Sequence, residues 1–326
     1  MTVLVTGGTE YIGSHMVHTL LDRGRKVVVL DYLSTGVRAN VAQDASFVLG
    51  SVGDTALMKR VLAEHAVETV IHFSGSVIVP ESVENPILYY SNNTFASLHL
   101  VNAFIHSGVK KFIFSSTAAV YGITERNPVL EKDETNPINP YGRSKLMTEW
   151  LLDDAAHAHD FRFVALRYFN VAGADPKGRT GQSTPRATHL IKRACQAALG
   201  RVPQLEIFGT DFPTRDGTGI RDYIHVSDLA EVHALALEYL GDGGESQILN
   251  CGYGRGFSVR EVIDVVSKVS QRPLPTREAP RRAGDPPVIV ADCSRVTSEF
   301  GWQPRHNHLE EIVSTAYAWE RRLNAA

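Results

Sequence analysis

The sequence predicts an α/β protein built on a Rossmann-type doubly wound parallel sheet, with a smaller C-terminal α/β substrate domain. Three observations predict it. Short apolar runs alternate with stretches of helical periodicity through the first half of the chain. A glycine-rich turn directly follows the first apolar run, and the alternation loosens after about residue 170. Strand and helix repeated in this order are typical of a parallel sheet with helices on both faces.

The predicted strands are short, rich in β-branched or aromatic residues, and apolar at consecutive positions. Parallel strands that are covered on both faces have this composition. We predict strands at residues 3–5, 27–30, 47–49, 70–73, 112–114 and 163–166. Helices are predicted between them at 12–22 and 55–65, where apolar residues recur with helical spacing.

Two domains are expected. Residues 1–170 are predicted to form a dinucleotide-binding Rossmann domain that also takes back roughly residues 220–242, and residues 171–326 form the second domain. The second part has loops rich in turn-forming residues at 177–185 and 212–219. Between its short strands we predict helices near 187–199, 227–240, 259–270 and 308–322. Such a cap would lie over the C-terminal strand ends, where ligands bind in open α/β sheets.

The composition excludes several classes of protein. Hydrophobic residues make up 43% and charged residues 21% of the 326 residues, as in a globular protein with a sizeable core. The net charge is -3 without a basic stripe, which gives no reason to expect nucleic acid or an anionic membrane as partner. No apolar run reaches the ~18 residues that span a bilayer. The three widely spaced cysteines, Cys195, Cys251 and Cys293, favour neither a disulfide framework nor a metal cluster and suit a cytoplasmic protein.

A glycine-rich turn between the first strand and the first helix predicts a dinucleotide site. Gly7, Gly8 and Gly13 lie in this turn. There, the amides of a helix N-terminus meet a pyrophosphate, whose charge the helix dipole also favours. Asp31 stands at the end of the second strand. A carboxylate at this place accepts the two hydroxyls of an adenosine ribose and repels a 2′-phosphate, so we expect NAD rather than NADP.

Hydroxyls and a Tyr-x-x-x-Lys pair predict the chemistry. Tyr141 and Lys145 are four residues apart and share one helix face, and Thr117 follows the strand at 112–114. A lysine ammonium beside a phenol, with the positive charge of a nicotinamide nearby, favours the phenolate, so we expect the pKa of Tyr141 to fall towards neutrality. The tyrosine can then remove the proton of a sugar hydroxyl while hydride leaves the same carbon. The three side chains resemble the triad of the short-chain dehydrogenases.

With these motifs, the sequence resembles the UDP-glucose 4-epimerases of the extended short-chain dehydrogenase/reductase superfamily over essentially its whole length. Further segments that carry the resemblance are residues 70–73, 80–83, 89–93, 167–170, 221–226 and 281–285. The resemblance implies an NAD-dependent isomerase that oxidises C4 of a UDP-sugar, turns the 4-keto sugar in its pocket and returns the hydride to the other face. NAD is then a resident catalyst.

The resemblance also implies a set of site residues. As catalytic residues it implies Thr117, Tyr141 and Lys145. Around NAD it places Gly7, Glu10, Tyr11, Ile12, Gly13, Asp31, Ser51, Val52, Phe73, Asn92, Ser115, Tyr141, Lys145 and Tyr168. Around the UDP-sugar it places Thr117, Tyr141, Phe169, Asn170, His189, Leu190, Arg221, Arg282 and Asp285, with the arginines on the diphosphate and Asp285 on the uridine ribose. No metal is expected.

Four positions depart from the family pattern, all on the cofactor side: Glu10, Tyr32, Ser51 and Val77. Glu10 replaces a glycine beside the pyrophosphate. We expect it to need a positive φ, at a cost of ~1 kcal/mol or more, and to repel the phosphates. The hypothesis is weakened NAD retention.

Alternatives stay open for the substrate and for the class of function. The family's gate position is Ile289, which is neither the bulky tyrosine of restrictive members nor the small residue of permissive ones. Another UDP-sugar, such as an N-acetylhexosamine, uronate or pentose, is therefore an alternative substrate, and a non-catalytic NAD-binding sensor is an alternative function. Ala118 and Ala119 stand where a 4,6-dehydratase needs a carboxylate pair, which disfavours that reaction. The helices near 93–106 and 141–156 are apolar enough on one face to pair with a symmetry mate. The resemblance implies a homodimer, and a monomer is the alternative.

Overall fold

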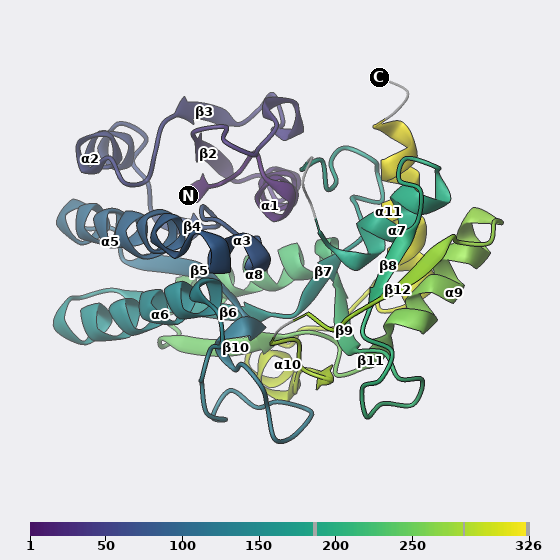
Figure 1. The fold of residues 1–326 in the computed structure, drawn as a ribbon. Coiled ribbons are helices and arrows are strands. Elements are labelled where there is room, and N and C mark those ends of the chain that lie inside the picture. Colours follow the sequence, from purple (N-terminus) through teal and green to yellow (C-terminus); the bar gives the residue numbers. More distant parts are fainter. Residues whose placement is uncertain (185–187, 283, 324–326) are drawn as a thin grey trace.

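A computed structural model describes residues 1–184, 188–282 and 284–323. Part of the predicted helix at 187–199, the end of the loop at 177–185 and one residue of the motif at 281–285 lie outside the described residues. Figure 1 shows an N-terminal α/β unit on the left and a smaller unit, which holds α7, α9 and α11, on the right. Within the described residues, every helix is too short or too polar to span a membrane.

The larger unit is a seven-stranded parallel sheet with the strand order β10-β6-β5-β4-β1-β2-β3. The prediction of a doubly wound sheet is confirmed, because the chain starts at β1 in the interior and winds outward in both directions. The strands are β1 (Thr2–Thr6), β2 (Lys26–Asp31), β3 (Ser46–Leu49), β4 (Thr69–His72), β5 (Lys111–Thr117), β6 (Arg162–Tyr168) and β10 (Gln247–Cys251). Each of the six predicted strands falls within or next to one of them.

Helices cover both faces of this sheet with apolar side chains. On one face, α1 (Tyr11–Asp22) and α8 (Val226–Gly241) pack on alternate residues of the strands. On the other face lie α2 (Thr55–Glu64), α5 (Ala96–Ser107) and α6 (Pro140–Ala158). The inner strands are buried on both sides, which is why their sequences are apolar at consecutive positions, whereas the edge strand β3 is only partly buried.

After the chain has entered the smaller unit at residues 170–172, it returns to the large sheet. Helix α8 lies within the returning segment expected at 220–242, but β9 (Ile220–His225), which precedes it, belongs to the smaller unit. Strand β10 also joins the large sheet beside β6, beyond the expected segment. Short apolar strands of this kind look alike in sequence whichever sheet they join, so only the pairing assigns them.

The smaller unit has its own core between α7 (Leu190–Ala198), α9 (Val259–Ser270) and α11 (Leu309–Arg322). Strand β9 is flanked by β7 (Asn170–Ala172), β11 (Gly256–Ser258) and β13 (Val288–Ile289), and β8 (Leu205–Phe208) pairs with β12 (Thr276–Ala279). Parallel pairing of β7 with β9 ties this unit to the end of β6. The smaller unit therefore meets the carboxyl edge of the large sheet.

Several short elements complete the described chain. One π-helical segment, Tyr90–Phe95, joins α4 to α5, and such segments are frequent at functional sites. The others are the 3₁₀ turns Arg38–Asn40 and Ala118–Val120 and the helices α3 (Val79–Glu84), α4 (Pro86–Tyr89) and α10 (Ser294–Phe300).

Candidate active site

The predicted cofactor loop closes tightly at the end of β1. Gly7 has a φ of +70°, a conformation that L side chains rarely adopt, and a Cβ on Gly13 would lie 2.2 Å from the Gly7 carbonyl oxygen. Both positions therefore require glycine. The side chain of Glu10, which precedes α1, makes no capping hydrogen bond to this helix, so it leaves the first-turn amides of Tyr11, Ile12 and Gly13 to a ligand. This cradle fits a pyrophosphate.

Glu10 corrects one prediction. Its φ is -78° and its ψ 174°, an extended conformation that any residue adopts, so the expected positive φ and its strain are wrong. The Thr35 hydroxyl donates a hydrogen bond to the Glu10 carboxylate, which holds it towards the loop after β2. Burial and the charge of Asp31 raise the pKa of Glu10, while the bond from Thr35 lowers it. What remains of the hypothesis is repulsion of a negatively charged ligand.

Asp31 lies buried at the carboxyl end of β2. One carboxylate oxygen accepts hydrogen bonds from the Thr9 hydroxyl at 2.6 Å and from the Thr9 amide at 3.1 Å, and the other accepts from the Leu33 amide at 2.8 Å. The cofactor loop itself therefore orients this carboxylate. Thr9 is a residue that the sequence did not single out, although it lies between the glycines of the motif.

The other residues expected around NAD follow the strand ends. Ser51 and Val52 come after β3, Phe73 after β4, and Asn92 lies in the π-helical segment. The Asn92 amide donates to the Ser76 hydroxyl at 3.1 Å. At the ends of β5 and β6, the hydroxyls of Ser115 and Tyr168 form a hydrogen bond. Tyr11 donates from its hydroxyl to the Gly173 carbonyl at 2.7 Å, which links α1 to the segment after β7.

The predicted catalytic side chains come together at the end of β5. Thr117 is the last residue of β5, and Tyr141 and Lys145 lie on the first two turns of α6, with Tyr141 hydrogen-bonded to Thr117. The Lys145 ammonium donates to the Ser115 carbonyl at 3.0 Å and lies 5.0 Å from the centre of the Phe114 ring. All three predicted residues are at most 9% exposed. Asn139 caps α6 by accepting from the Gly142 amide at 2.8 Å, which fixes the turn that carries Tyr141.

The electrostatics of this cluster are set first by burial. Burial raises the pKa of Tyr141 above its usual value, and the hydrogen bond with Thr117 lowers it in part. Burial also lowers the pKa of Lys145 to about 8. Among the protein groups, desolvation of the phenolate thus outweighs the hydrogen bond with Thr117. The fall of the pKa of Tyr141 towards neutrality, which includes the positive charge of a bound nicotinamide, stays a prediction.

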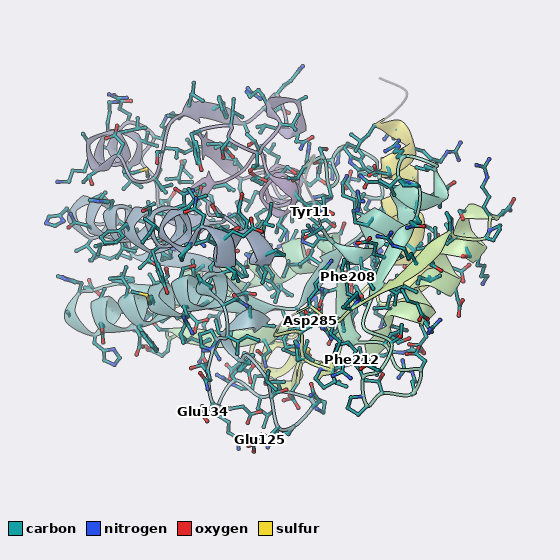
Figure 2. All side chains as sticks on the ribbon, viewed as in Figure 1. Tyr11, Glu125, Glu134, Phe208, Phe212 and Asp285 are labelled. Atoms are coloured by element: carbon teal, nitrogen blue, oxygen red, sulfur yellow. The ribbon has the colours of Figure 1, made fainter. Side chains whose placement is uncertain are left out.

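The residues expected around UDP lie on the smaller unit. Arg221 of β9 pairs with Asp285 at 3.5 Å, so the structure brings together two of the predicted ligand-holding side chains. The guanidinium of Arg282 lies 3.8 Å from the centre of the Phe208 ring. Figure 2 labels Phe208, Phe212 and Asp285 in one part of this unit. Arg282 is thus presented beside an aromatic ring, Phe208, that the sequence did not single out.

The residues predicted around the sugar come from both units. Asn170 begins β7 and, with His189 and Leu190 at the start of α7, lines a cavity in the smaller unit. Phe169 packs in one cluster with Ile289, Ala118 and Leu146, the last on the catalytic helix. The predicted gate Ile289 therefore lies in the same apolar cluster as residues next to Thr117 and Lys145.

Sequence reasoning missed the polar groups behind the triad. Glu149 and Arg167 form a buried ion pair, and Ser116 donates to Glu149. Spacing offered a partial signal, since Glu149 lies four residues after Lys145 on the same helix face. Among the described residues, no group of three or more metal-ligating side chains could hold a metal ion.

Comparison with known proteins identifies the family. Residues 3–252 match the model of the NAD dependent epimerase/dehydratase family. The chain belongs to this family. The matched segment runs from β1 to β10, so it covers the whole of the large sheet and both elements of the catalytic cluster.

Within this broad family, the chain is similar to UDP-glucose 4-epimerases. The UDP-glucose 4-epimerase of Azospirillum brasilense is 56% identical over 321 residues, which cover 98% of this chain and 92% of the relative. The UDP-glucose 4-epimerase of Brucella ovis in complex with NAD has a TM-score of 0.95 at 43% identity, with 98% of each chain covered. The enzyme of Stenotrophomonas maltophila, solved with NAD and formylated UDP-arabinopyranose, has a TM-score of 0.96 at 39% identity, with 100% of each chain covered.

Proposed function

We propose that this chain is an NAD-dependent isomerase that interconverts UDP-glucose and UDP-galactose by inverting C4 of the sugar. The observation that carries the proposal is the buried cluster of Thr117, Tyr141 and Lys145 at the carboxyl edge of the sheet. It lies in a family member whose relatives include UDP-glucose 4-epimerases that match 98% of this chain. Bound NAD+ would accept the hydride from C4 and return it, and would add a positive charge near the phenol.

The side chains divide the work of the reaction. Tyr141 takes the proton of the C4 hydroxyl and gives it back when the carbonyl is reduced. Thr117 bridges that hydroxyl through its hydrogen bond with Tyr141, which also favours the phenolate. Burial of the Lys145 ammonium strengthens its field, since charges interact more strongly in a medium of low dielectric constant.

We assign UDP to the smaller unit. Arg221 and Arg282 offer guanidinium groups to the diphosphate, for which planar forks are well suited. Asp285, now paired with Arg221, would accept from the uridine ribose. Holding the nucleotide and leaving the sugar loosely packed lets the 4-keto sugar turn, because the binding energy is then supplied away from the reacting carbon.

The test is to incubate the purified protein with UDP-galactose without added NAD. We expect UDP-glucose to form, with no net accumulation of NADH. A Tyr141→Phe variant with the same bound NAD is the matched control and should not turn over. If no UDP-glucose forms either with or without added NAD, the alternative of a non-catalytic NAD-binding sensor replaces this proposal.

We further propose that the protein works as a homodimer through α5 and α6. Figure 1 shows the two helices on the same flank of the large unit. They expose Leu98, Met147 and Trp150, and the adjoining π-helical segment exposes Phe95, which is 60% accessible. Contiguous exposed apolar side chains mark association surfaces. Replacing Phe95 and Trp150 by Glu should give a monomer in sedimentation velocity, whereas a monomeric wild-type protein contradicts the proposal.

We propose the cytoplasm as the site of action. The cysteines Cys195, Cys251 and Cys293 are free, and the first two are buried. Unpaired cysteines are usual where thiols are kept reduced. Fractionation of cells that express the tagged protein would test this.

A further inference from the structure

The catalytic helix α6 carries three polar residues on one face. Tyr141, Lys145 and Glu149 follow each other at intervals of four residues, so they lie in a row along the helix. All three are buried, and Glu149 is only 1% exposed. Each binds one of three consecutive residues at the end of β5: Tyr141 binds the Thr117 hydroxyl, Lys145 the Ser115 carbonyl and Glu149 the Ser116 hydroxyl.

Glu149 is held on its other side by Arg167 of β6. Arg167 donates from Nε at 3.0 Å and from Nη2 at 2.6 Å to the two carboxylate oxygens, a two-pronged contact that fixes both distance and orientation. Ser116 and Arg167 are direct neighbours across β5 and β6. The carboxylate of Glu149 therefore joins the helix to both strands at one level of the sheet.

Arg167 is itself fixed from the catalytic side of the sheet. It donates from Nη1 to the Tyr121 hydroxyl at 3.0 Å, and its guanidinium lies 4.9 Å from the centre of the Tyr121 ring. Tyr121 in turn donates to the Asn250 side chain at 2.7 Å, on β10. Tyr121 follows the 3₁₀ turn that starts directly after Thr117. The guanidinium is thus held by α6 through Glu149 and by the segment after β5 through Tyr121.

The buried Glu149–Arg167 ion pair is expected to add little net stability. Desolvation of two buried charges offsets most of their attraction, and replacing a buried ion pair by apolar residues of similar size is often neutral or stabilising. What the pair does supply is geometry. A helix that rests on the sheet through apolar contacts alone can slide or rotate slightly, and an error of about 1 Å at reacting groups can cost about 10²-fold in rate.

We infer that Glu149 and Arg167 are positioning residues, which set the rotation and height of α6 so that Tyr141 meets both Thr117 and the C4 hydroxyl. This inference rests on the proposed function. Neither residue is assigned to substrate or NAD, so the effect passes through the helix. Loss of the pair should weaken the Thr117–Tyr141 bond, and because that bond lowers the pKa of Tyr141, its pKa should rise.

The main test is the double variant Glu149→Leu with Arg167→Met, which removes both charges and leaves neither unpaired. We expect a folded protein with the NAD content of the wild type, a kcat for UDP-galactose about 10²-fold lower, and a KM changed by less than about twofold. The acidic limb of the kcat–pH profile should move to higher pH. A matched control is Arg23→Met with Glu231→Leu, which removes a half-buried ion pair between α1 and α8 and should leave all four quantities unchanged.

A purely stabilising role predicts a different result. If the double variant keeps the wild-type kcat and pH profile, the inference is overturned, whatever happens to its melting temperature. If it does not fold, Glu149→Gln takes its place, since it keeps the shape and one acceptor but loses the charge. The same loss in kcat and the same shift in pH profile are expected of Glu149→Gln, and wild-type values would overturn the inference. A wild-type protein without turnover would instead refute the proposed function.

Discussion

Lys145 should destabilise the folded protein at neutral pH, and its replacement by Met tests this directly. The ammonium is 2% exposed, and burial lowers its pKa from the ordinary 10.5 to about 8. Such a difference between the unfolded and folded states corresponds to about 3 kcal/mol of unfolding free energy. Since the folded state holds the proton less tightly, the cost is fully present below pH 8 and is relieved as the pH rises from 8 to 10.5.

The Lys145→Met variant carries no such cost but loses the bond to the Ser115 carbonyl, whose loss can cost about 1–3 kcal/mol. At pH 7 the relieved cost of burying the ammonium and the lost hydrogen bond nearly cancel. The free energy of unfolding at this pH alone therefore does not separate them. Their pH dependence differs, however. Between pH 7 and pH 9.5 the wild type should gain about 2 kcal/mol relative to the variant, because the unfolded chain binds more protons in this window. The variant should be inactive throughout.

The assay is urea unfolding of both proteins at pH 7 and pH 9.5, with the same NAD content because a bound ligand adds to stability. Lys59→Met on α2 is the matched control, since Lys59 is exposed and its replacement should give a pH-independent difference. If the difference between wild type and Lys145→Met is the same at both pH values, the ammonium is not desolvated as described. In that case the strengthened field that the Lys145 ammonium is proposed to exert on Tyr141 is refuted as well.

Three further predictions concern the chemistry, the cofactor and the sugar. Tyr141→Phe should lower kcat by about 10²–10⁴-fold with unchanged NAD content by chromatography; turnover at the wild-type rate would exclude Tyr141 as the base. Glu10→Gln removes a charge worth about 1 kcal/mol near the pyrophosphate, so exchange of bound NAD for labelled NAD should be about fivefold slower. An equal exchange rate would show that the Glu10 carboxylate does not repel the cofactor. Ile289→Ser should raise kcat/KM for an N-acetylated UDP-sugar relative to UDP-galactose and Ile289→Tyr should lower it, whereas equal ratios would exclude a gate here.

The sequence was sufficient for the large sheet because its signals are local. Consecutive apolar residues predict doubly covered strands, and the turn around Gly7 and Gly13 predicts the first crossover. The place of Asp31 follows from the same strand–helix–strand pattern. Since the strand after α1 runs parallel to β1, it ends beside the glycine-rich loop. Strand β10 was beyond such reasoning, because a short apolar run does not reveal which sheet it joins.

Two features of the site depend on surroundings rather than on spacing. The conformation of Glu10 depends on how the chain enters α1, and an extended N-cap residue removes the need for a positive φ. The pKa of Tyr141 depends on burial, and the Tyr-x-x-x-Lys spacing says nothing of how dry the site is. The Glu149–Arg167 pair likewise needs the register of β5 and β6, which places Ser116 beside Arg167.

Along the catalytic helix α6, the residues that anchor the helix differ from those assigned to the chemistry. Its C-terminal half is packed by Leu152 and neighbouring apolar residues into the core that also buries α2 and α5. At its N-terminus, the space is so close that a Cβ on Gly142 would lie 2.5 Å from the Ala119 carbonyl oxygen. Between these two anchors, the face towards β5 holds a costly ammonium and an ion pair that offers little net stability. The apolar anchors can sustain that cost, so variants that improve this face for stability should do so at the expense of turnover.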